Sequence, residues 1–195
     1  LSLKVIKFSV EKFLNELINN GITDICCLDS GDDEKNNLSL STVIAASRMS
    51  EITFRLSPQI TDLKRVKKIS KYMKNLKVGG CSSWEMDGSI GSRTAAFELP
   101  YKDDEKNFGK EYYSKEQIKT IISKFDENEF QTLVHAIGTN AIDNIIGAYI
   151  ELFENREYKA NEKRHRIEHF EFPSEDHIQK AIEMQLCISV QPGYS

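Results

Sequence analysis

The sequence has no long apolar run. Its 195 residues scatter apolar side chains among charged ones, and no segment approaches the roughly 18 consecutive apolar residues of a membrane-spanning helix. The first residues also lack a signal-peptide pattern. We therefore expect no membrane partner and a cytoplasmic location. Because the chain begins with Leu1, we expect a trimmed piece of a longer protein.

Basic stripes and zinc-type cysteine patterns are missing too. The net charge is −4, and the densest basic run, residues 64–74, fits the solvated face of a helix. No nucleic-acid partner is expected from this balance. The four cysteines lie in apolar, strand-like stretches without metal-site spacing, which predicts buried, reduced thiols as in the cytosol. They are Cys26, Cys27, Cys81 and Cys187.

Strand and helix patterns alternate along the chain. Short apolar runs predict six strands, and apolar residues at helical spacing fill the intervals between them. The predicted strands are residues 22–28, 52–56, 78–86, 132–137, 166–172 and 186–190. This alternation predicts a single α/β domain over residues 1–195, with a parallel sheet that forms either a barrel or an open doubly wound sheet.

Residues 87–113 form a long segment without periodicity. Such segments are usually functional or disordered, and in parallel folds sites form after the C-terminal ends of strands. Asp87 is a tentative catalytic residue here, although Asp before Gly is also an ordinary turn pair. Residues 88–92, which are Gly and Ser with one Ile, could hold an anion together with Arg93, a tentative substrate-binding residue.

Two of the four histidines, His135 and His169, end predicted strands. The C-terminal ends of neighbouring parallel strands share one edge, and neutral imidazole is the commonest protein metal ligand. The pair is therefore a candidate metal site, while the alternative for each is a hydrogen-bonded core histidine. His165 begins its strand and is predicted to be structural. His177 lies in the first turn of a helix and is predicted to be solvated.

Glu168 precedes His169 in the same strand. Because side chains alternate along a strand, Glu168 is predicted to face the helices and to pair there with an Arg or Lys. It is therefore not expected to bind a metal.

Four segments resemble the amidohydrolase superfamily in order and separation. They are DGSIGSRTAA at 87–96, VHAIG at 134–138 with AID at 141–143, RHRIEH at 164–169, and SVQP at 189–192. The resemblance is to the branch of predicted metal-dependent hydrolases that includes N-substituted formamide deformylase. Residues 21–23, together with Asp29, are a weaker match to an earlier barrel strand of the family.

The resemblance implies a partial TIM-like β/α barrel of about six parallel strands. It also implies a divalent metal, often zinc, that activates water to attack an amide-like small-molecule substrate at a C–N bond other than a peptide bond. His135 would be the metal ligand of the fifth barrel strand and His169 that of the sixth.

The sequence departs from this family pattern in several places. No histidine precedes His135, so the His-x-His pair of the first strand is absent, and the chain ends before an eighth strand. Ser83 stands four residues before Asp87, where the family often has a metal-bridging lysine. Thr139 and Asn140 stand where Asp-Arg is common.

These departures predict a fragment with an incomplete metal site, which binds metal weakly and hydrolyses little by itself. Its unpaired sheet edges predict self-association. The alternatives are a non-catalytic α/β binding module with an anion-holding Gly/Ser loop, and a degenerate barrel without activity. The positions of His135 and His169 relative to each other discriminate between these hypotheses.

Overall fold

A computed structural model describes residues 3–28, 31–33, 38–73, 75–154 and 161–194 of the chain. Asp29, part of the weaker family match, lies outside these residues. The chain divides into two compact units, Leu1–Lys77 and Val78–Ser195. No helix in the described part is long and apolar enough to cross a membrane.

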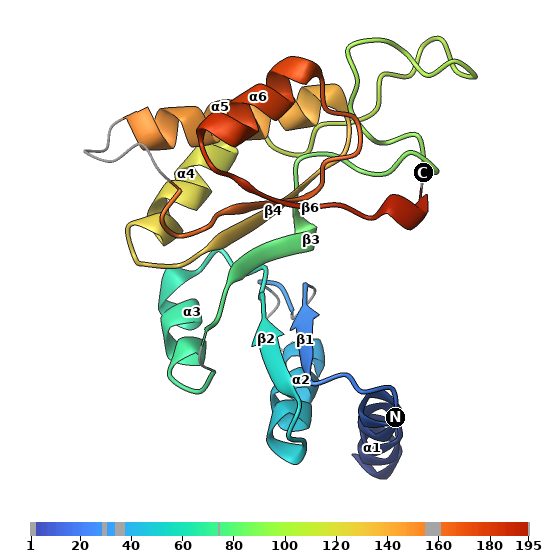
Figure 1. Cartoon of the computed structure of the whole chain (residues 1–195), viewed down its shortest axis with the longest axis vertical. Helices are drawn as coiled ribbons and strands as arrows, with labels where there is room; N and C mark the ends of the chain where they lie inside the picture. Colours follow the sequence, from blue (N-terminus) through green and yellow to red (C-terminus); the bar gives the residue numbers. More distant parts are fainter. Residues whose placement is uncertain (1–2, 29–30, 34–37, 74, 155–160, 195) are drawn as a thin grey trace. The chain divides into compact units, whose positions relative to one another are not determined.

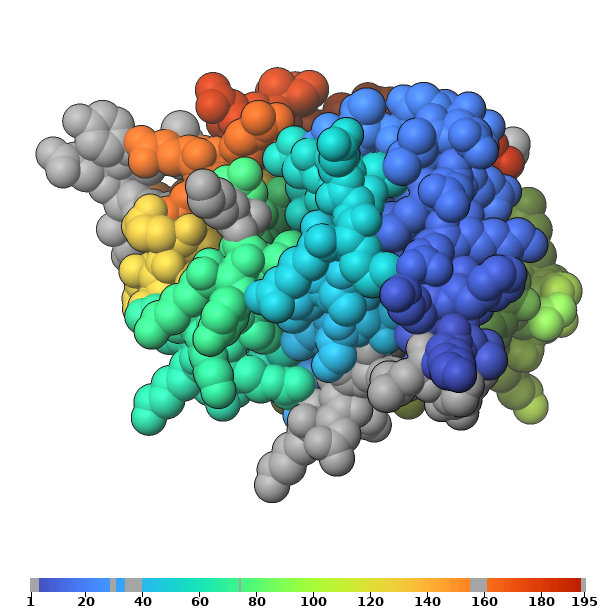
Figure 2. Space-filling view, turned by 90° about the horizontal axis from the view of Figure 1, so that it is seen from below, coloured from blue at the N-terminus to red at the C-terminus, as the bar shows by residue number. Residues whose placement is uncertain are grey.

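The first unit contains a small parallel sheet of two strands that pair in register. Its elements in chain order are α1 (Leu3–Asn19), β1 (Asp24–Cys27), α2 (Leu38–Met49), β2 (Thr53–Leu56) and α3 (Leu63–Ser70). The Asp62 carboxylate caps α3 by accepting two backbone N–H groups. Helix α1, drawn in dark blue, lies at the surface in Figure 2, where Phe8 is 67% exposed.

The second unit is a four-stranded parallel sheet whose strand order, β3-β4-β5-β6, follows the chain. Its elements are β3 (Val78–Glu85), α4 (Lys115–Asp126), β4 (Thr132–Ala136), α5 (Thr139–Glu154), β5 (Arg166–His169), α6 (Glu175–Glu183), β6 (Cys187–Ser189) and the 3-10 helix η1 (Pro192–Tyr194). Helices α4, α5 and α6 lie over one face of this sheet (Figure 1). Consecutive parallel strands joined by helices are the repeating unit of a β/α barrel.

The alternation of six strands with helices confirms the sequence prediction. At α6, Ser174 and His177 form a reciprocal capping box, in which the Ser174 hydroxyl accepts the His177 N–H and the His177 ring accepts the Ser174 N–H. This role buries His177, which is 6% exposed. The prediction that His177 is solvated was therefore wrong, because capping draws its ring against the backbone.

The cysteines are less buried than the sequence predicted. Cys26 is exposed, and it lies in β1, whose four residues are all exposed or half-buried. Cys27, Cys81 and Cys187 are half-buried. None of the four forms a disulfide.

Two irregularities shape the C-terminal edge of the larger sheet. In β3, Gly80 pairs with Val134 and the next paired residue is Glu85, so residues 81–84 leave the ladder as a bulge. At the end of β5, His169 has a φ of 73° and Phe170 a φ of 52°. This left-handed backbone ends the strand earlier than the apolar pattern predicted.

His165 joins elements at the opposite edge of this sheet. Its Nδ1 accepts the backbone N–H of Thr132 at 3.0 Å, so Nε2 carries the proton and donates to Asp126 Oδ1 at 2.8 Å. The Asn161 side chain bonds both the N–H and the carbonyl of His165. His165 is fully buried, and its predicted structural role is confirmed.

Replacing this ring should destabilise the fold. We expect His165→Ala to lower the free energy of unfolding by about 3 kcal/mol, because it empties a packed site and removes buried hydrogen-bond partners. Urea unfolding followed by circular dichroism measures the change. In the control His177→Gln, the capping box should survive, since Gln117 has the same role in α4, and the effect should stay within about 0.5 kcal/mol. Equal losses in both variants would contradict the special role of His165.

Candidate metal centre

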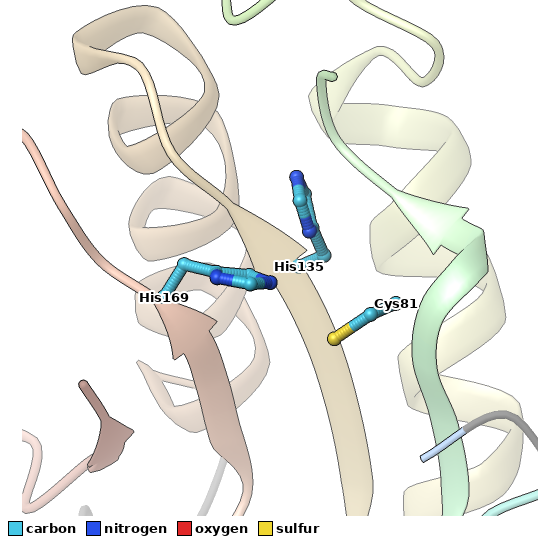
Figure 3. A group of neighbouring side chains, drawn as sticks. All are labelled: Cys81, His135 and His169. Carbon is cyan, nitrogen blue, oxygen red and sulfur yellow. The ribbon is translucent and has the colours of Figure 1, made fainter. Parts of the chain in front are cut away.

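Three side chains meet at the C-terminal edge of the larger sheet. Cys81 comes from the bulge of β3, His135 from β4 and His169 from the end of β5, and Figure 3 shows the three side chains grouped together. One ligand atom from each lies within 4.8 Å of the other two. The two imidazole centroids are 4.5 Å apart. Both histidines thus occupy one small space, as their positions at the ends of adjacent strands predicted; that they bind a metal stays a prediction.

Cys81 was missed by the sequence reasoning. Counting back from Asp87 leads to Ser83, but Ser83 lies in the bulge outside the cluster, and its carbonyl accepts the Tyr113 hydroxyl at 2.8 Å. Cys81 is the β3 residue that reaches the two histidines. The signal available in the sequence was the pair Gly79-Gly80, since glycines inside a strand often mark a bulge where residue counting fails.

The backbone fixes the tautomer of His135. Its Nε2 lies 3.1 Å from the carbonyl oxygen of Gly88. Because a carbonyl only accepts, Nε2 carries the proton and Nδ1 keeps the lone pair. This Nδ1 is buried and has no hydrogen-bond partner. A buried, unsatisfied lone pair on a residue of a cluster of possible ligands fits a metal ion.

Burial also keeps His135 neutral. It lowers the pKa of His135 from 6.5 to about 4; the bond to the Gly88 carbonyl opposes this shift, and the neighbouring His169 adds to it. At pH 7 the ring is therefore uncharged, which is the form that binds metals.

His169 owes its orientation to the left-handed backbone at the end of β5. Its Nδ1 lies 3.6 Å from Glu171 Oε1, and a carboxylate at this ring nitrogen would leave Nε2 for a metal. Simple alternation would instead turn His169 to the opposite face from Glu168. The break in strand geometry brings its ring beside His135.

Glu168 is fully buried and forms an ion pair with Arg166, as predicted. Its predicted direction toward the helices was wrong. Glu168 is in register with His135, and paired residues of parallel strands share a face of the sheet. Alternation counted from His169 fails because His169 does not have an extended backbone.

Asp87 organises the start of the long loop. It is fully buried, and its carboxylate accepts the backbone N–H groups of Ala96, Ile137 and Gly138 at 2.7–3.0 Å. Burial raises the pKa of Asp87, and these three bonds oppose the rise. Its Oδ1 stands 3.6 Å from His135 Nε2, beyond a hydrogen bond. Asp87 thus links the loop to the end of β4, close to the His135 ring.

The Gly/Ser loop uses its polar groups internally. The Ser89 N–H donates to Thr94 Oγ1 at 3.1 Å, and the Ser92 and Thr94 hydroxyls bond to each other. Arg93 donates from Nε to Asp103 at 3.0 Å. This geometry gives the anion-binding alternative no support. Arg93 stays a predicted substrate-binding residue, and it would have to leave Asp103 to meet a substrate.

Comparison with known proteins identifies the family. The model of the amidohydrolase family matches residues 4–195. This chain belongs to the amidohydrolase family. It is 28% identical over 108 residues to the putative amidohydrolase YtcJ of Bacillus subtilis, and 29% identical over 136 residues to the protein LONG AFTER FAR-RED 3 of Arabidopsis thaliana. These matches cover 55% and 70% of this chain, but only 20% and 23% of the relatives.

Two solved structures share the fold of the amidohydrolase chain. One is an uncharacterised metal-dependent hydrolase of Pyrococcus furiosus, with a TM-score of 0.73 and 23% identity, and the other is a similar hydrolase of Pyrococcus horikoshii OT3, with a TM-score of 0.71 and 20% identity. The two structural matches cover all of this chain, but only 39% and 38% of the solved chains. The likeness confirms an α/β fold consistent with part of a TIM-like barrel.

The donor set of the amidohydrolase chain suits a transition metal. Imidazole and thiolate are ligands for zinc, cobalt and copper, whereas magnesium and calcium prefer oxygen. Ligand atoms on one tetrahedral zinc lie roughly 3.3–3.6 Å apart, because zinc–ligand bonds are about 2.0–2.3 Å long. The separations within 4.8 Å are close enough for small side-chain rotations to bring the three atoms onto one ion.

The lowered pKa of His135 predicts a pH dependence of stability for the metal-free chain. Between pH 6.5 and about 4, the unfolded state holds a proton on His135 that the folded state does not, so stability falls as the pH falls through this window. Urea unfolding in the presence of a chelator measures the free energy of unfolding at pH 7 and at pH 4.5. The decrease from pH 7 to pH 4.5 should be about 2 kcal/mol smaller in His135→Gln than in the unaltered chain. Identical losses in both proteins would refute the buried, neutral state of the ring.

Proposed function

We propose that this chain is part of a metal-dependent hydrolase that cleaves C–N bonds other than peptide bonds. The observation that carries the proposal is the meeting of His135 and His169 at one sheet edge, with a buried lone pair on His135 Nδ1. The chain spans only about a fifth of the length of the curated relatives it matches, and the activity of the whole protein is part of this proposal.

We propose zinc as the metal, and each residue of the site has its own role in binding it. His135 offers Nδ1 because Gly88 holds its other nitrogen, and His169 offers the nitrogen that faces away from Glu171. Asp87 keeps the loop, and with it the Gly88 carbonyl, against His135. A bound divalent metal would lower the pKa of water toward ~7 and polarise a substrate carbonyl.

The proposed substrate is a small amide-like molecule, such as the substituted formamides named by the resemblance. Asp87 is proposed as a residue that supports the site rather than one that meets the substrate, because its carboxylate oxygens already accept three backbone N–H groups. Its burial agrees with this role.

Metal binding by the two histidines tests the proposed function. Competition against a zinc chelator should show that His135→Gln and His169→Gln each weaken zinc binding by about 100-fold, while His177→Gln leaves it unchanged. The zinc-loaded chain should hydrolyse N-formyl and N-acyl amides slowly, and EDTA should abolish the reaction. Unchanged zinc affinity in both variants, or turnover that resists EDTA, would contradict the proposal.

We also propose that the chain self-associates through the open edge of its larger sheet. Among the described strands, β6 pairs only with β5, and an unpaired edge offers its backbone groups to a second strand. Light scattering should show a mass that rises with concentration above the 22.3 kDa of one chain. Val190→Lys, which adds a charge just beyond β6, should shift the chain toward the monomer. A monomer at every concentration would rule this out.

A further inference from the structure

We infer that Cys81 is a third metal ligand, so that a thiolate and two imidazoles hold one transition-metal ion. The inference rests on the proposed metal binding by His135 and His169 and adds the ligand that defines the type of site. In the resemblance to the family, a lysine from this strand bridges two metals. Here the same strand offers a sulfur, which points to a centre with a single metal.

The position of Cys81 is set by packing on both sides of the β3 bulge. Before it, Gly79 has a φ of 97°, and a Cβ there would lie 2.0 Å from the carbonyl oxygen of Leu133. After it, Trp84 is fully buried, with its ring 5.3 Å from that of Phe125. The bulge is therefore held at both ends, and Cys81 is held where the bulge leaves the ladder.

Burial and access both suit a ligand role. His135 is 6% exposed, whereas Cys81 and His169 are half-buried, so the cluster is buried on the side of His135 and more open on the side of the other two residues. The buried side carries the unsatisfied Nδ1 of His135. An ion could enter from the open side and satisfy this lone pair while it bonds the sulfur.

Three protein ligands and one open position form the usual composition of a catalytic zinc site. With Cys81 included, residues 78–195 supply this number without a His-x-His pair from another strand. In the described part of the chain, this is the one group of three or more suitable side chains. A thiolate favours zinc, cobalt, cadmium or copper over magnesium and manganese.

Cobalt reports sulfur ligation directly, because a thiolate bound to Co²⁺ gives a near-ultraviolet charge-transfer band that imidazole lacks. We expect the 195-residue chain to bind about one Co²⁺ with this band. Cys81→Ser should lose the band and bind Co²⁺ at least tenfold more weakly. The matched control Cys187→Ser removes another half-buried strand cysteine outside the cluster. It should keep the charge-transfer band and the affinity for Co²⁺.

The outcomes separate the inference from the proposed function. Cobalt bound without the band, and lost in His135→Gln, would overturn the role of Cys81 and leave the two histidines as ligands. Cobalt binding that neither Cys81→Ser nor His135→Gln weakens would overturn both the role of Cys81 and the proposed metal binding by the histidines.

A measurement on the unaltered chain covers the case in which Cys81→Ser fails to fold. Zinc should slow alkylation of Cys81 by iodoacetamide at least tenfold, as measured by peptide mass spectrometry, while Cys187 in the same sample reacts at the same rate with and without zinc. Equal alkylation of Cys81 in both conditions would overturn the inference.

Discussion

The candidate site depends on the parallel pairing of β3, β4 and β5. Parallel strands in sequential order end at the same edge of the sheet, so residues far apart in the chain are brought to one edge. Pairing alone would still not bring these three side chains together. The bulge of β3 carries Cys81 to the histidines, and the left-handed backbone of His169 turns its ring toward His135. Regular strands position the site, and two breaks in regularity complete it.

The loop after β3 supports this arrangement from behind. The Asp87 carboxylate accepts backbone N–H groups from the loop and from the end of β4, so it links the two. Glycine is required where they touch, since a Cβ on Gly138 would lie 2.0 Å from the carbonyl oxygen of Ala96. The Gly88 carbonyl then meets His135 and selects its tautomer. A long irregular loop therefore has a definite physical role: it sets which nitrogen of His135 a metal would meet.

The sequence predicted the strands, the α/β class and the meeting of His135 with His169, because these follow from apolar periodicity and from the shared edge of parallel strands. It did not predict Cys81, since counting from Asp87 assumed a regular strand and led to Ser83. The direction of Glu168 failed for a similar reason, because alternation was counted through a residue with a positive φ. Backbone breaks of this kind depend on tertiary packing, such as that of Trp84 against Phe125, which a local pattern does not record.

The most direct measurement is anomalous X-ray scattering at the zinc absorption edge from crystals of the zinc-loaded chain. The account predicts one strong peak at the C-terminal edge of the sheet, within roughly 2.0–2.3 Å of His135 Nδ1, a His169 nitrogen and Cys81 Sγ. A peak bonded to other residues, or no peak at this edge in crystals that contain zinc, would contradict it.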